Sequence, residues 1–311
     1  MSDLTLSVII PTYNRAATLR KTLDALALQE PTRLGCEILV VDDGSTDDTL
    51  ATAQAYTEKG MPVRFMACPH RGPAAARNTG IDHSQGRLIL FMGDDMIASP
   101  RFLQAHLEAH DEHPVNHVAI VGDVRWSPEL VITPFMHWLD HGGPYFSFYE
   151  LANDDRLDHR YFITANLSLK RAFLADERFD ETFIWAAYED TELGYRLMKS
   201  GLQLLFKPIP VYHLHPVTVE SAAKRMYYSG RAARQLERKW PEITGLEYIH
   251  HSRMQVVLRR KWLSAGINGC LRPIVGGLNI RWPSRVYRYL LNHARWRGYV
   301  EERQAELDKT G

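Results

Sequence analysis

The sequence predicts an α/β fold in which a mostly parallel central sheet is flanked by helices and followed by a C-terminal helical extension. Three observations lead to this prediction. Short runs rich in Val, Ile and Leu alternate with helix-like segments through the first hundred residues, which is typical of βαβ units and a parallel sheet. Paired aspartates follow two of these runs. A basic, helix-like stretch begins beyond residue 216.

The alternating region contains four predicted strands and four predicted helices. The strands cover residues 6–11, 37–41, 63–67 and 87–92, and the helices cover residues 16–29, 47–59, 73–83 and 100–112. Ligands of open parallel sheets bind at the carboxyl ends of the strands. We therefore expect the functional site where the paired aspartates follow the second and fourth strands.

The remainder of the chain is less regular. We predict a strand at residues 118–126, then an irregular segment at residues 127–161 that faces an acceptor in part. A strand at residues 162–170 leads into a short helix. Beyond His215 we predict helices, and these cover residues 219–240, 246–267 and 284–309.

Charge is distributed unevenly along the 311 residues, although basic and acidic residues are equal in number at 37 each. Residues 217–311 contain 18 basic and 8 acidic residues, which leaves 19 basic and 29 acidic residues in 1–216. Such an asymmetry suggests two parts with different partners. We therefore expect one domain at residues 1–216 and a basic helical region at residues 217–311.

Several classes of protein are disfavoured by patterns that the sequence lacks. The three cysteines are odd in number and lack metal-ligand spacing, which favours a reducing compartment and a cytoplasmic location. No window reaches the length of a membrane-spanning helix. The phosphate loops GxGxxG and GxxxxGK, and the motifs HExxH and GxSxG, are absent. A nucleotide site would therefore use carboxylates and a metal.

The stretch FMGDDM places Asp94 and Asp95 directly after an apolar run, although carboxylates are poor strand residues. Adjacent carboxylates repel each other unless a cation or a hydroxyl lies between them. At a strand end, one side chain can reach Mg²⁺ or Mn²⁺ while its neighbour reaches a sugar hydroxyl. A polar turn is the alternative interpretation.

A second pair, Asp42 and Asp43, follows the second predicted strand. The two pairs together place four carboxylates on one edge of one sheet, where a cation or a nucleotide donor would relieve their repulsion. For Asp42 alone a turn role stays open. Ser45 and Asp48 match a capping box, so we expect Asp47 and Asp48 to be structural.

The segment YEDTELGYRL has the pattern of a helix with Asp190 at the start of an inward-facing stripe. The other residues of this stripe are Leu193, Gly194 and Leu197. A carboxylate at this position is either an N-terminal cap or a general base in a pocket, and both interpretations stay open. Glu192 and Arg196 are expected to form an exposed ion pair.

The sequence VYHLHP alternates so that His213 and His215 fall on one face of a predicted strand. Imidazoles in this arrangement can supply a metal ligand. A single histidine is more often an interior hydrogen-bonding group, so both interpretations stay open.

Basic residues and tryptophans are interleaved in the C-terminal region. They are Arg259, Arg260, Lys261, Trp262, Arg281, Trp282, Arg295, Trp296 and Arg297. The pattern indicates either a helix on an anionic membrane surface or a face that packs on the acidic domain. No recognition motif accompanies these charges, so we expect no nucleic-acid partner.

Taken in order, these motifs resemble the inverting A-type glycosyltransferases of family 2. The resemblance is carried by LSVIIPTYN, VVDDGST, RGPAAARNTG, GDD, ITANLSLKR with Asn166, and YEDTELGYRL. It extends from about Leu4 to His215. Gly93 stands where the family usually has an acidic residue.

The resemblance implies how a nucleotide sugar would be bound. The residues that would line the nucleotide base are Pro11, Thr12, Tyr13 and Asp43. Arg77 would lie near the base or the phosphates, and Asp94 would face the ribose and the donor sugar.

The resemblance also implies a metal site and a catalytic base. Asp95 would bind Mg²⁺ or Mn²⁺ beneath the diphosphate, and His213 or His215 would complete the metal site. Asp190 would be the general base.

These roles imply an inverting hexosyltransferase that moves a sugar from a nucleoside diphosphate sugar, with UDP as the expected nucleotide. The acceptor would be a hydroxyl of a saccharide or a lipid-linked molecule, as in polysaccharide biosynthesis for the cell envelope. Residues 1–216 would form the nucleotide-sugar-binding domain. Peripheral contact with the inner face of the cell membrane and a homo-oligomer are left open.

Two other functions stay open. A sugar-nucleotide nucleotidyltransferase also pairs an α/β sheet with metal-binding aspartates, but it begins with a glycine-rich, lysine-bearing loop where this chain has PTYNRAATL. A catalytically inactive nucleotide-sugar-binding scaffold is the second, and the intact Asp94, Asp95 and Asp190 disfavour it.

Overall fold

The structure is a computed structural model that describes residues 4–30, 35–145, 148–243, 269 and 271–310. Contacts divide the chain into two compact units. One contains Met1–Leu130 and Phe148–His215, and the other contains Val131–Ser147 and Pro216–Gly311. The helix predicted at residues 246–267, with Arg259, Arg260, Lys261 and Trp262, lies outside the described residues.

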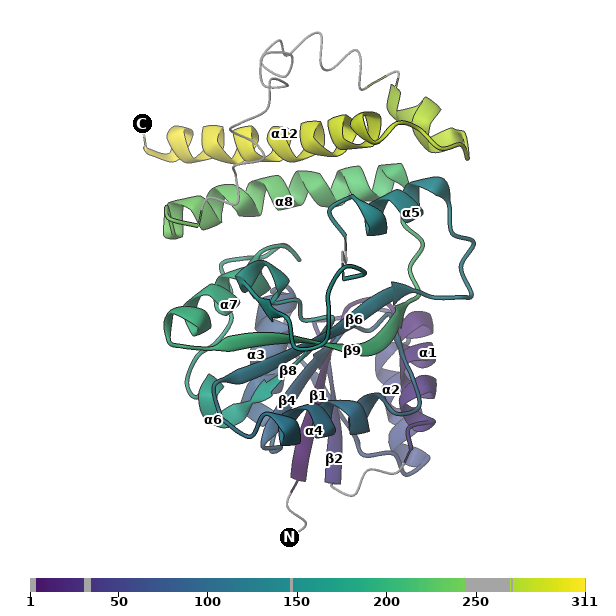
Figure 1. Ribbon diagram of the computed structural model, residues 1–311, viewed down its shortest axis with the longest axis vertical. Helices are drawn as coiled ribbons and strands as arrows, with labels where there is room; N and C mark the ends of the chain where they lie inside the picture. The colour runs from purple at the N-terminus through teal and green to yellow at the C-terminus, as the bar shows by residue number, and fades with distance from the viewer. Residues whose placement is uncertain (1–3, 31–34, 146–147, 244–268, 270, 311) are drawn as a thin grey trace. The chain divides into compact units, whose positions relative to one another are not determined.

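The first unit is built around a nine-stranded mixed sheet (Figure 1) in the order β3-β2-β1-β4-β8-β6-β9-β5, with β7 paired to β9. The strands are β1 (Leu4–Thr12), β2 (Gly35–Asp42), β3 (Val63–Ala67), β4 (Leu88–Met92), β5 (Met96–Ala98), β6 (Val118–Trp126), β7 (Arg156–Leu157), β8 (Asn166–Lys170) and β9 (Gln203–His213). Only β5, β7 and β8 run against the other strands. The predicted mostly parallel sheet is therefore confirmed.

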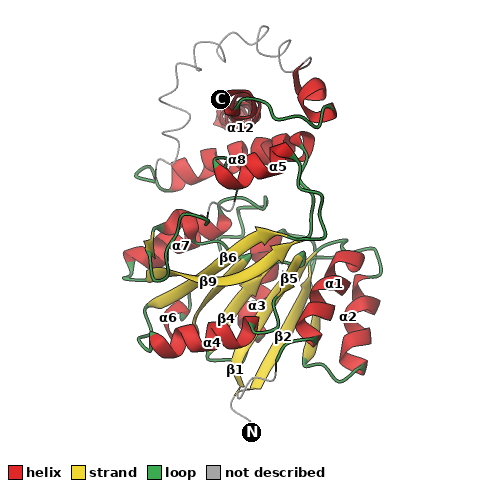
Figure 2. Ribbon diagram, turned by 45° about the vertical axis from the view of Figure 1, so that its right-hand side comes forward, coloured by secondary structure: helices red, strands yellow, loops and turns green. Residues whose placement is uncertain are grey.

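Helices cover both faces of this sheet, as Figure 2 shows. They are α1 (Ala16–Ala27), α2 (Thr49–Glu58), α3 (Pro73–His83), α4 (Phe102–Glu112), α6 (Arg171–Leu174) and α7 (Glu189–Lys199), with a short 3₁₀ helix at His159–Tyr161. Helix α3 packs on β1 and β2, and α4 packs on β6 and β9. Every residue of β4 is buried, which is typical of a strand covered on both faces.

Strand register brings the site residues to one edge. Thr12 at the end of β1 pairs with Asp42 at the end of β2, and Ile9 of β1 pairs with Phe91 of β4. The loops that follow β2 and β4 therefore leave the sheet on the two sides of β1. The paired aspartates therefore follow β2 and β4, the two strands that flank β1, at one edge of the sheet, as predicted.

The half of the sheet formed by β8, β6, β9 and β5 differs from the prediction. Strand β9 begins at Gln203 and β8 begins at Asn166, and β5 was not predicted. Two prolines, Pro208 and Pro210, obscure β9, because proline is disfavoured inside a sheet. The structure accommodates them where the register between β6 and β9 shifts, between Val121 and Asp123.

The segment at residues 127–161 was predicted to be irregular, and this is wrong in part. It contains helix α5 (Pro134–His141), which begins after Thr133, whose Oγ1 accepts a hydrogen bond from the Met136 N–H at 3.2 Å. The helix buries Phe135 and Leu139 among other apolar side chains. Its eight residues, beginning with a proline, are too few to show a helical period in the sequence.

The predicted capping box at Ser45 and Asp48 is also wrong. Helix α2 begins at Thr49, and no side chain caps it from Asp48. Instead Asp47 accepts hydrogen bonds from the N–H of Thr49 at 3.1 Å and of Ala16 at 3.0 Å. Asp47 is therefore structural, as predicted, because it joins the beginnings of α1 and α2.

The second unit contains α5 and two long helices, α8 (Val219–Lys239) and α12 (Ser284–Thr310), as predicted for residues 219–240 and 284–309. Helices α8 and α12 pack together (Figure 1). Their backbones approach closely at Gly230 and Gly298: a Cβ at Gly230 would lie 1.8 Å from the Arg295 carbonyl oxygen. Arg231 and Arg234 form ion pairs with Glu302 and Glu306 of α12 at 2.6 Å and 2.9 Å, so these two charges stabilise the helix pair.

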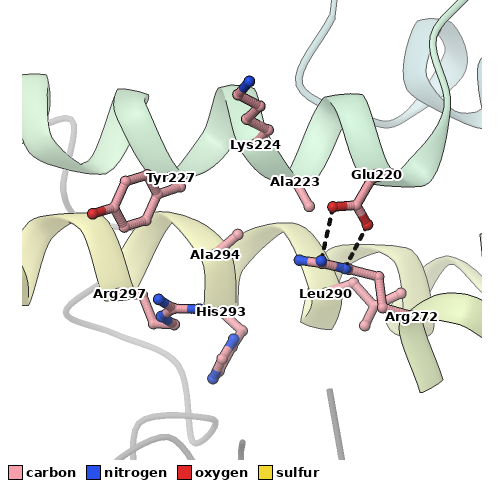
Figure 3. Close-up of a pocket in the computed structure, with 9 residues that line it drawn as sticks. All are labelled: Glu220, Ala223, Lys224, Tyr227, Arg272, Leu290, His293, Ala294 and Arg297. Atoms are coloured by element: carbon pink, nitrogen blue, oxygen red, sulfur yellow. Dashed lines mark hydrogen bonds and ion pairs between the residues drawn. The ribbon is translucent and has the colours of Figure 1, made fainter. Parts of the chain in front are cut away.

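A pocket of about 230 Å³ lies between α8 and α12 (Figure 3). Glu220 and Arg272 form an ion pair at one end, 2.7 Å between Oε2 and Nε. At the other end Arg297 lies 5.7 Å from the ring centroid of Tyr227 and pairs with Glu301 at 3.2 Å.

Among the residues that the structure describes, no helix is long and apolar enough to cross a membrane.

The close approach of α8 and α12 yields a prediction. Gly230→Ala should lower the free energy of unfolding by about 1–3 kcal/mol, because the added methyl group overlaps backbone that cannot move aside. Gly277→Ala, where a Cβ meets nothing within 4 Å, is the matched control and should be neutral or stabilising. Urea unfolding of the three proteins measures both effects, and equal stabilities for the two variants would contradict the described packing.

Candidate functional site

The floor of the site is formed where β1, β2 and β4 end. Thr12 Oγ1 donates a hydrogen bond to Asp94 Oδ2 at 2.8 Å, and the Asp43 N–H donates to the Thr12 carbonyl at 2.9 Å. Thr22 of α1 donates from its hydroxyl to the Asp94 carbonyl at 2.8 Å. These bonds fix the loop after β4 against β1 and α1.

Asp43 organises the loop that precedes α3. Its carboxylate accepts hydrogen bonds from the N–H groups of Arg71 and Gly72, both at 2.9 Å, and its Oδ2 lies 2.8 Å from His70 Nδ1. Gly72 has a φ of 93°, and a Cβ there would lie 2.9 Å from the Ile184 carbonyl oxygen. The carboxylate of Asp43 is therefore committed to this loop. Its role in binding a base stays a prediction.

An aromatic surface lies next to Asp43. The rings of Tyr13 and His70 are stacked, with centroids 4.1 Å apart and an angle of 16° between their planes. Tyr13 is 42% exposed, and Pro11 is partly exposed one strand position before Thr12. The arrangement offers a flat, accessible face at the edge of the sheet.

Asp42 has the turn role that was one of its two interpretations. Its carboxylate accepts a hydrogen bond from the Ser45 N–H at 3.0 Å.

Asp94 and Asp95 are both buried, and one nitrogen atom bridges them. Arg15 Nη1 lies 2.9 Å from Asp94 Oδ1 and 2.7 Å from Asp95 Oδ2. Arg15 is the residue that precedes α1, immediately after the PTYN stretch. Sequence reasoning missed Arg15, since only the folded chain shows which carboxylates a long basic side chain can reach.

The two carboxyl groups differ in acidity. Burial and the neighbouring charge of Asp95 raise the pKa of Asp94 to about 6. Burial would also raise the pKa of Asp95, but the hydrogen bond and charge of His213, together with Arg15, hold it well below its usual range. Asp95 is therefore the more acidic member of the pair.

The two histidines occupy different environments. His213 is buried at the end of β9, where its Nε2 lies 3.4 Å from Asp95 Oδ2 and its ring packs edge-on against Trp126. His215 is exposed, beyond the end of the strand. The prediction that both lie on one face of a strand is wrong, because β9 ends at His213. Just beyond the strand, the Leu214 N–H donates a hydrogen bond to the Asp95 carbonyl at 2.9 Å.

These side chains fit a divalent metal. Within the described parts of the chain, no three His, Cys, Asp or Glu side chains already surround one point as metal ligands. The Arg15 nitrogen nevertheless occupies a cation position between two carboxylates, and Asp95 with His213 offers the oxygen and nitrogen donors that Mg²⁺ or Mn²⁺ accepts. A Cβ at Gly93 would lie 2.9 Å from Asp95 Oδ1, so the missing acidic residue would stand beside the same carboxylate.

Asp190 is the second residue of α7 and is partly exposed. The helix begins after Tyr188, which has a φ of 68°, and no side chain caps it from that position. Asp190 Oδ1 accepts from the N–H of Thr191 at 2.7 Å, so it is not the N-cap residue. The predicted inward stripe is confirmed for Leu193, Gly194 and Leu197, which are buried, but Asp190 at its start is only partly buried.

A buried ion pair connects the start of α7 to α3. Arg77 Nη1 lies 2.9 Å from Glu189 Oε1, and both side chains are almost inaccessible to solvent. Burial and the charge of Asp190 raise the pKa of Glu189 to about 7, although Arg77 opposes the shift. The resemblance implied that Arg77 lies near the base or the phosphates, whereas the structure pairs it with Glu189. Asp43 holds the loop before α3, and Arg77 of α3 pairs with Glu189, the residue before Asp190. A series of contacts through α3 therefore connects Asp43 to the start of α7.

The Glu192–Arg196 ion pair is present, with Nε and Oε1 2.9 Å apart, but it is not exposed as predicted. Glu192 has 0% of its surface accessible. Arg196 also contacts Glu177 and the Arg178 carbonyl. The pair faces the segment before α7, a tertiary contact that the spacing of four residues cannot show.

Asn166 lies at the start of β8, opposite Met92 of β4. Its Nδ2 donates to the carbonyls of Ile209 at 2.9 Å and Asp123 at 3.2 Å, and its Oδ1 accepts from His106 Nε2 at 2.9 Å. Asn166 therefore ties β8 to β6 and β9 just behind the Asp94–Asp95 loop.

Comparison with known proteins identifies the family. A sequence model of the family described as Glycosyl transferase family 2 matches residues 7–176, more than half of the chain. The chain therefore belongs to family 2 of the glycosyltransferases, as the motifs predicted.

Two relatives show how far the likeness extends. The validoxylamine A glucosyltransferase of Streptomyces hygroscopicus subsp. jinggangensis (strain 5008) is 31% identical over 243 residues, which cover 64% of this chain and 52% of the relative. The poly(ribitol-phosphate) beta-N-acetylglucosaminyltransferase TarS of Staphylococcus aureus (strain Mu50 / ATCC 700699) is 33% identical over 108 residues, or 34% of this chain and 19% of TarS. The chain thus spans about half the length of the first relative and about a fifth of the second.

Solved structures show the same fold. The S. aureus TarS 1-349 structure in complex with UDP has a TM-score of 0.56 at 17% identity and covers 97% of this chain and 92% of its own. Mannosyltransferase PcManGT from Pyrobaculum calidifontis, in complex with GDP-Man and Mn²⁺, has a TM-score of 0.65 at 16% identity and covers 98% and 91%. The predicted A-type glycosyltransferase fold is confirmed.

The buried Glu189 yields a prediction on pH. Because its pKa in the folded protein is raised to about 7, the folded state holds a proton that the unfolded chain releases near pH 4. The stability that this proton contributes is present below about pH 4 and is lost as the pH rises through 7. Between pH 5 and pH 8, the free energy of unfolding of wild type should therefore fall relative to that of Glu189→Gln.

Urea unfolding of both proteins at the two pH values measures this difference. Glu150→Gln, at an exposed position, controls for the loss of a surface carboxylate. A constant difference between wild type and Glu189→Gln would contradict the described environment of Glu189.

Proposed function

We propose that the protein is an inverting glycosyltransferase that moves a hexose from a nucleoside diphosphate sugar to a hydroxyl group of an acceptor. The observation that carries the proposal is the buried Asp94–Asp95 pair around one cation position, at the carboxyl edge of the sheet and joined through Thr12 to Asp43. The family match and the UDP or GDP-Man in the neighbouring structures support it. UDP is the nucleotide we favour.

The donor would bind along the edge of β1, β2 and β4. Tyr13 and Pro11 offer their surfaces to the base, and Thr12 together with Asp43 holds the edge in shape. Asp94, whose pKa is raised to about 6, is suited to hydrogen bonding with the ribose or the donor sugar. Arg77 is engaged with Glu189, so its contribution to phosphate binding would be indirect.

Asp95 and His213 would hold Mg²⁺ or Mn²⁺ at the diphosphate, and His215 is left as a second candidate at the mouth of the site. A bound divalent metal neutralises charge that develops on a departing diphosphate. The ionised state of Asp95 suits this role, because a carboxylate must be deprotonated to coordinate a metal. The Mn²⁺ in the PcManGT structure supports the choice of ion.

Asp190 would act as the general base. It would accept the proton of the acceptor hydroxyl while that oxygen attacks the anomeric carbon from the face opposite the diphosphate. The bond between the anomeric carbon and the diphosphate oxygen breaks, the nucleoside diphosphate leaves, and configuration inverts. Asp190 lies in the first turn of α7, where the N-terminus of a helix attracts negative charge.

The acceptor and cellular setting belong to the same proposal. A saccharide or lipid-linked acceptor fits the relatives, of which TarS carries poly(ribitol-phosphate) in its name. We retain from the sequence a division into a catalytic domain at residues 1–216 and a basic helical region at residues 217–311. A cytoplasmic location, peripheral membrane contact through the basic helices and a homo-oligomer are likewise retained as proposals.

The proposed base yields a prediction. Asp190→Asn should reduce sugar transfer by about 10²-fold or more, the size of effect expected for general base catalysis, while the affinity for the nucleoside diphosphate stays within about twofold. Asp176→Asn is the matched control, because Asp176 is an exposed carboxylate in the segment between α6 and α7, and this variant should retain activity. Loss of nucleotide affinity together with activity in Asp190→Asn would show that Asp190 is not the base.

The proposed metal site yields a second prediction. UDP should raise the melting temperature more in the presence of Mn²⁺ than without it, because a ligand that binds only the folded state stabilises it. Asp95→Asn should weaken Mn²⁺-dependent UDP binding by about tenfold or more, since even outer-shell changes at metal sites have effects of this size. A thermal-shift panel with UDP, GDP and dTDP, each with and without Mn²⁺, makes the measurement. An unchanged affinity in Asp95→Asn would remove this residue from the metal site.

A further inference from the structure

The contact between Arg15 and the two carboxylates has an unusual form. A guanidinium usually pairs with one carboxylate through two parallel hydrogen bonds. Here the single atom Nη1 contacts two different carboxylates, at 2.9 Å to Asp94 and 2.7 Å to Asp95. A nitrogen that bridges two carboxylates in this way resembles a bound metal ion more than one half of an arginine fork.

We propose that Arg15 is the resident cation of this site in the metal-free protein and that its side chain must leave the Asp94–Asp95 pair before a divalent metal can bind. This inference rests on the proposed function in one respect, namely that the metal is the ion that binds with the nucleotide donor. Arg15 is thus a positioning residue that sets the metal affinity of the site.

Charge explains why a cation must be present. Adjacent buried carboxylates repel each other unless a cation lies between them. Arg15 supplies one positive charge at their shared edge. It therefore keeps the loop after β4 in a metal-binding shape when no metal is bound.

Charge also explains why Arg15 and a metal exclude each other. Asp95 Oδ2 lies 2.7 Å from Arg15 Nη1 and 3.4 Å from His213 Nε2. A dication that is coordinated by this oxygen would lie within a few ångströms of a guanidinium nitrogen, and like charges at that distance repel strongly in a buried site. The two cations therefore cannot both occupy this position. When the metal binds, the side chain of Arg15 has to move aside.

The fold allows this movement. The carbonyl of Arg15 accepts from the N–H groups of Thr18 and Leu19 at 3.0 Å and 2.9 Å, which anchors its backbone at the start of α1. Its side chain is 38% exposed, whereas Asp94 and Asp95 are held by Thr12, Thr22 and the Leu214 N–H. The side chain can therefore rotate toward solvent while the carboxylates stay in place.

Binding of Mn²⁺ alone, without nucleotide, tests the proposal. Free Mn²⁺ measured by electron paramagnetic resonance should show that Arg15→Met binds the ion about tenfold more tightly than wild type, or more, because a charge-assisted hydrogen bond no longer competes. Arg20→Met, at an exposed position of the same helix, is the matched control and should bind Mn²⁺ as wild type does. In the absence of metal, Arg15→Met should melt at a lower temperature than wild type, and Mn²⁺ should raise its melting temperature more.

An Mn²⁺ affinity of Arg15→Met that equals or falls below that of wild type would overturn the proposal, as would a failure of both proteins to bind the ion. If Arg15→Met does not fold, Arg15→Gln provides the same test, since it keeps a hydrogen-bond donor without the charge. Tighter Mn²⁺ binding in either variant supports the proposal even if wild type transfers no sugar. That combination would leave the Arg15 proposal standing and the proposed function contradicted.

Discussion

Two adjacent buried carboxylates require a positive charge beside them, and this requirement connects most of the features of the site. Asp94 and Asp95 follow a strand that is buried along its whole length, so their loop cannot turn toward solvent without exposing that strand. The fold supplies Arg15 from the start of α1 and His213 from the end of β9. The charges that compensate this pair therefore come from both halves of the sheet.

A second set of contacts links the proposed base to this point. Asp43 holds the loop that leads into α3, and Arg77 of α3 pairs with Glu189 at the start of α7. Asp190 follows directly on Glu189. Residues far apart in the chain are thus connected from the donor edge to the first turn of α7 by buried polar contacts, and the electrostatic state of Glu189 depends on both Arg77 and Asp190.

Much of the fold could be predicted from local patterns, and the exceptions have physical causes. β3, β6 and α3 begin and end at the predicted residues, because their apolar runs and flanking breakers are local signals. β9 was mostly missed because two prolines lie at its register shift. In the site, the paired aspartates could be found from their place after strands. Arg15 and the burial of Glu192 could not, because both depend on residues brought near only by folding.

We propose above that Asp95 and His213, with Asp94 beside them, form the cation position of a donor site. Diffraction from crystals grown with Mn²⁺ and UDP, measured at the manganese absorption edge, tests it most directly. We expect an anomalous peak within coordination distance of Asp95, with the Arg15 side chain turned away from both carboxylates. A manganese peak elsewhere, with Arg15 still bridging Asp94 and Asp95 in the presence of UDP, would contradict it.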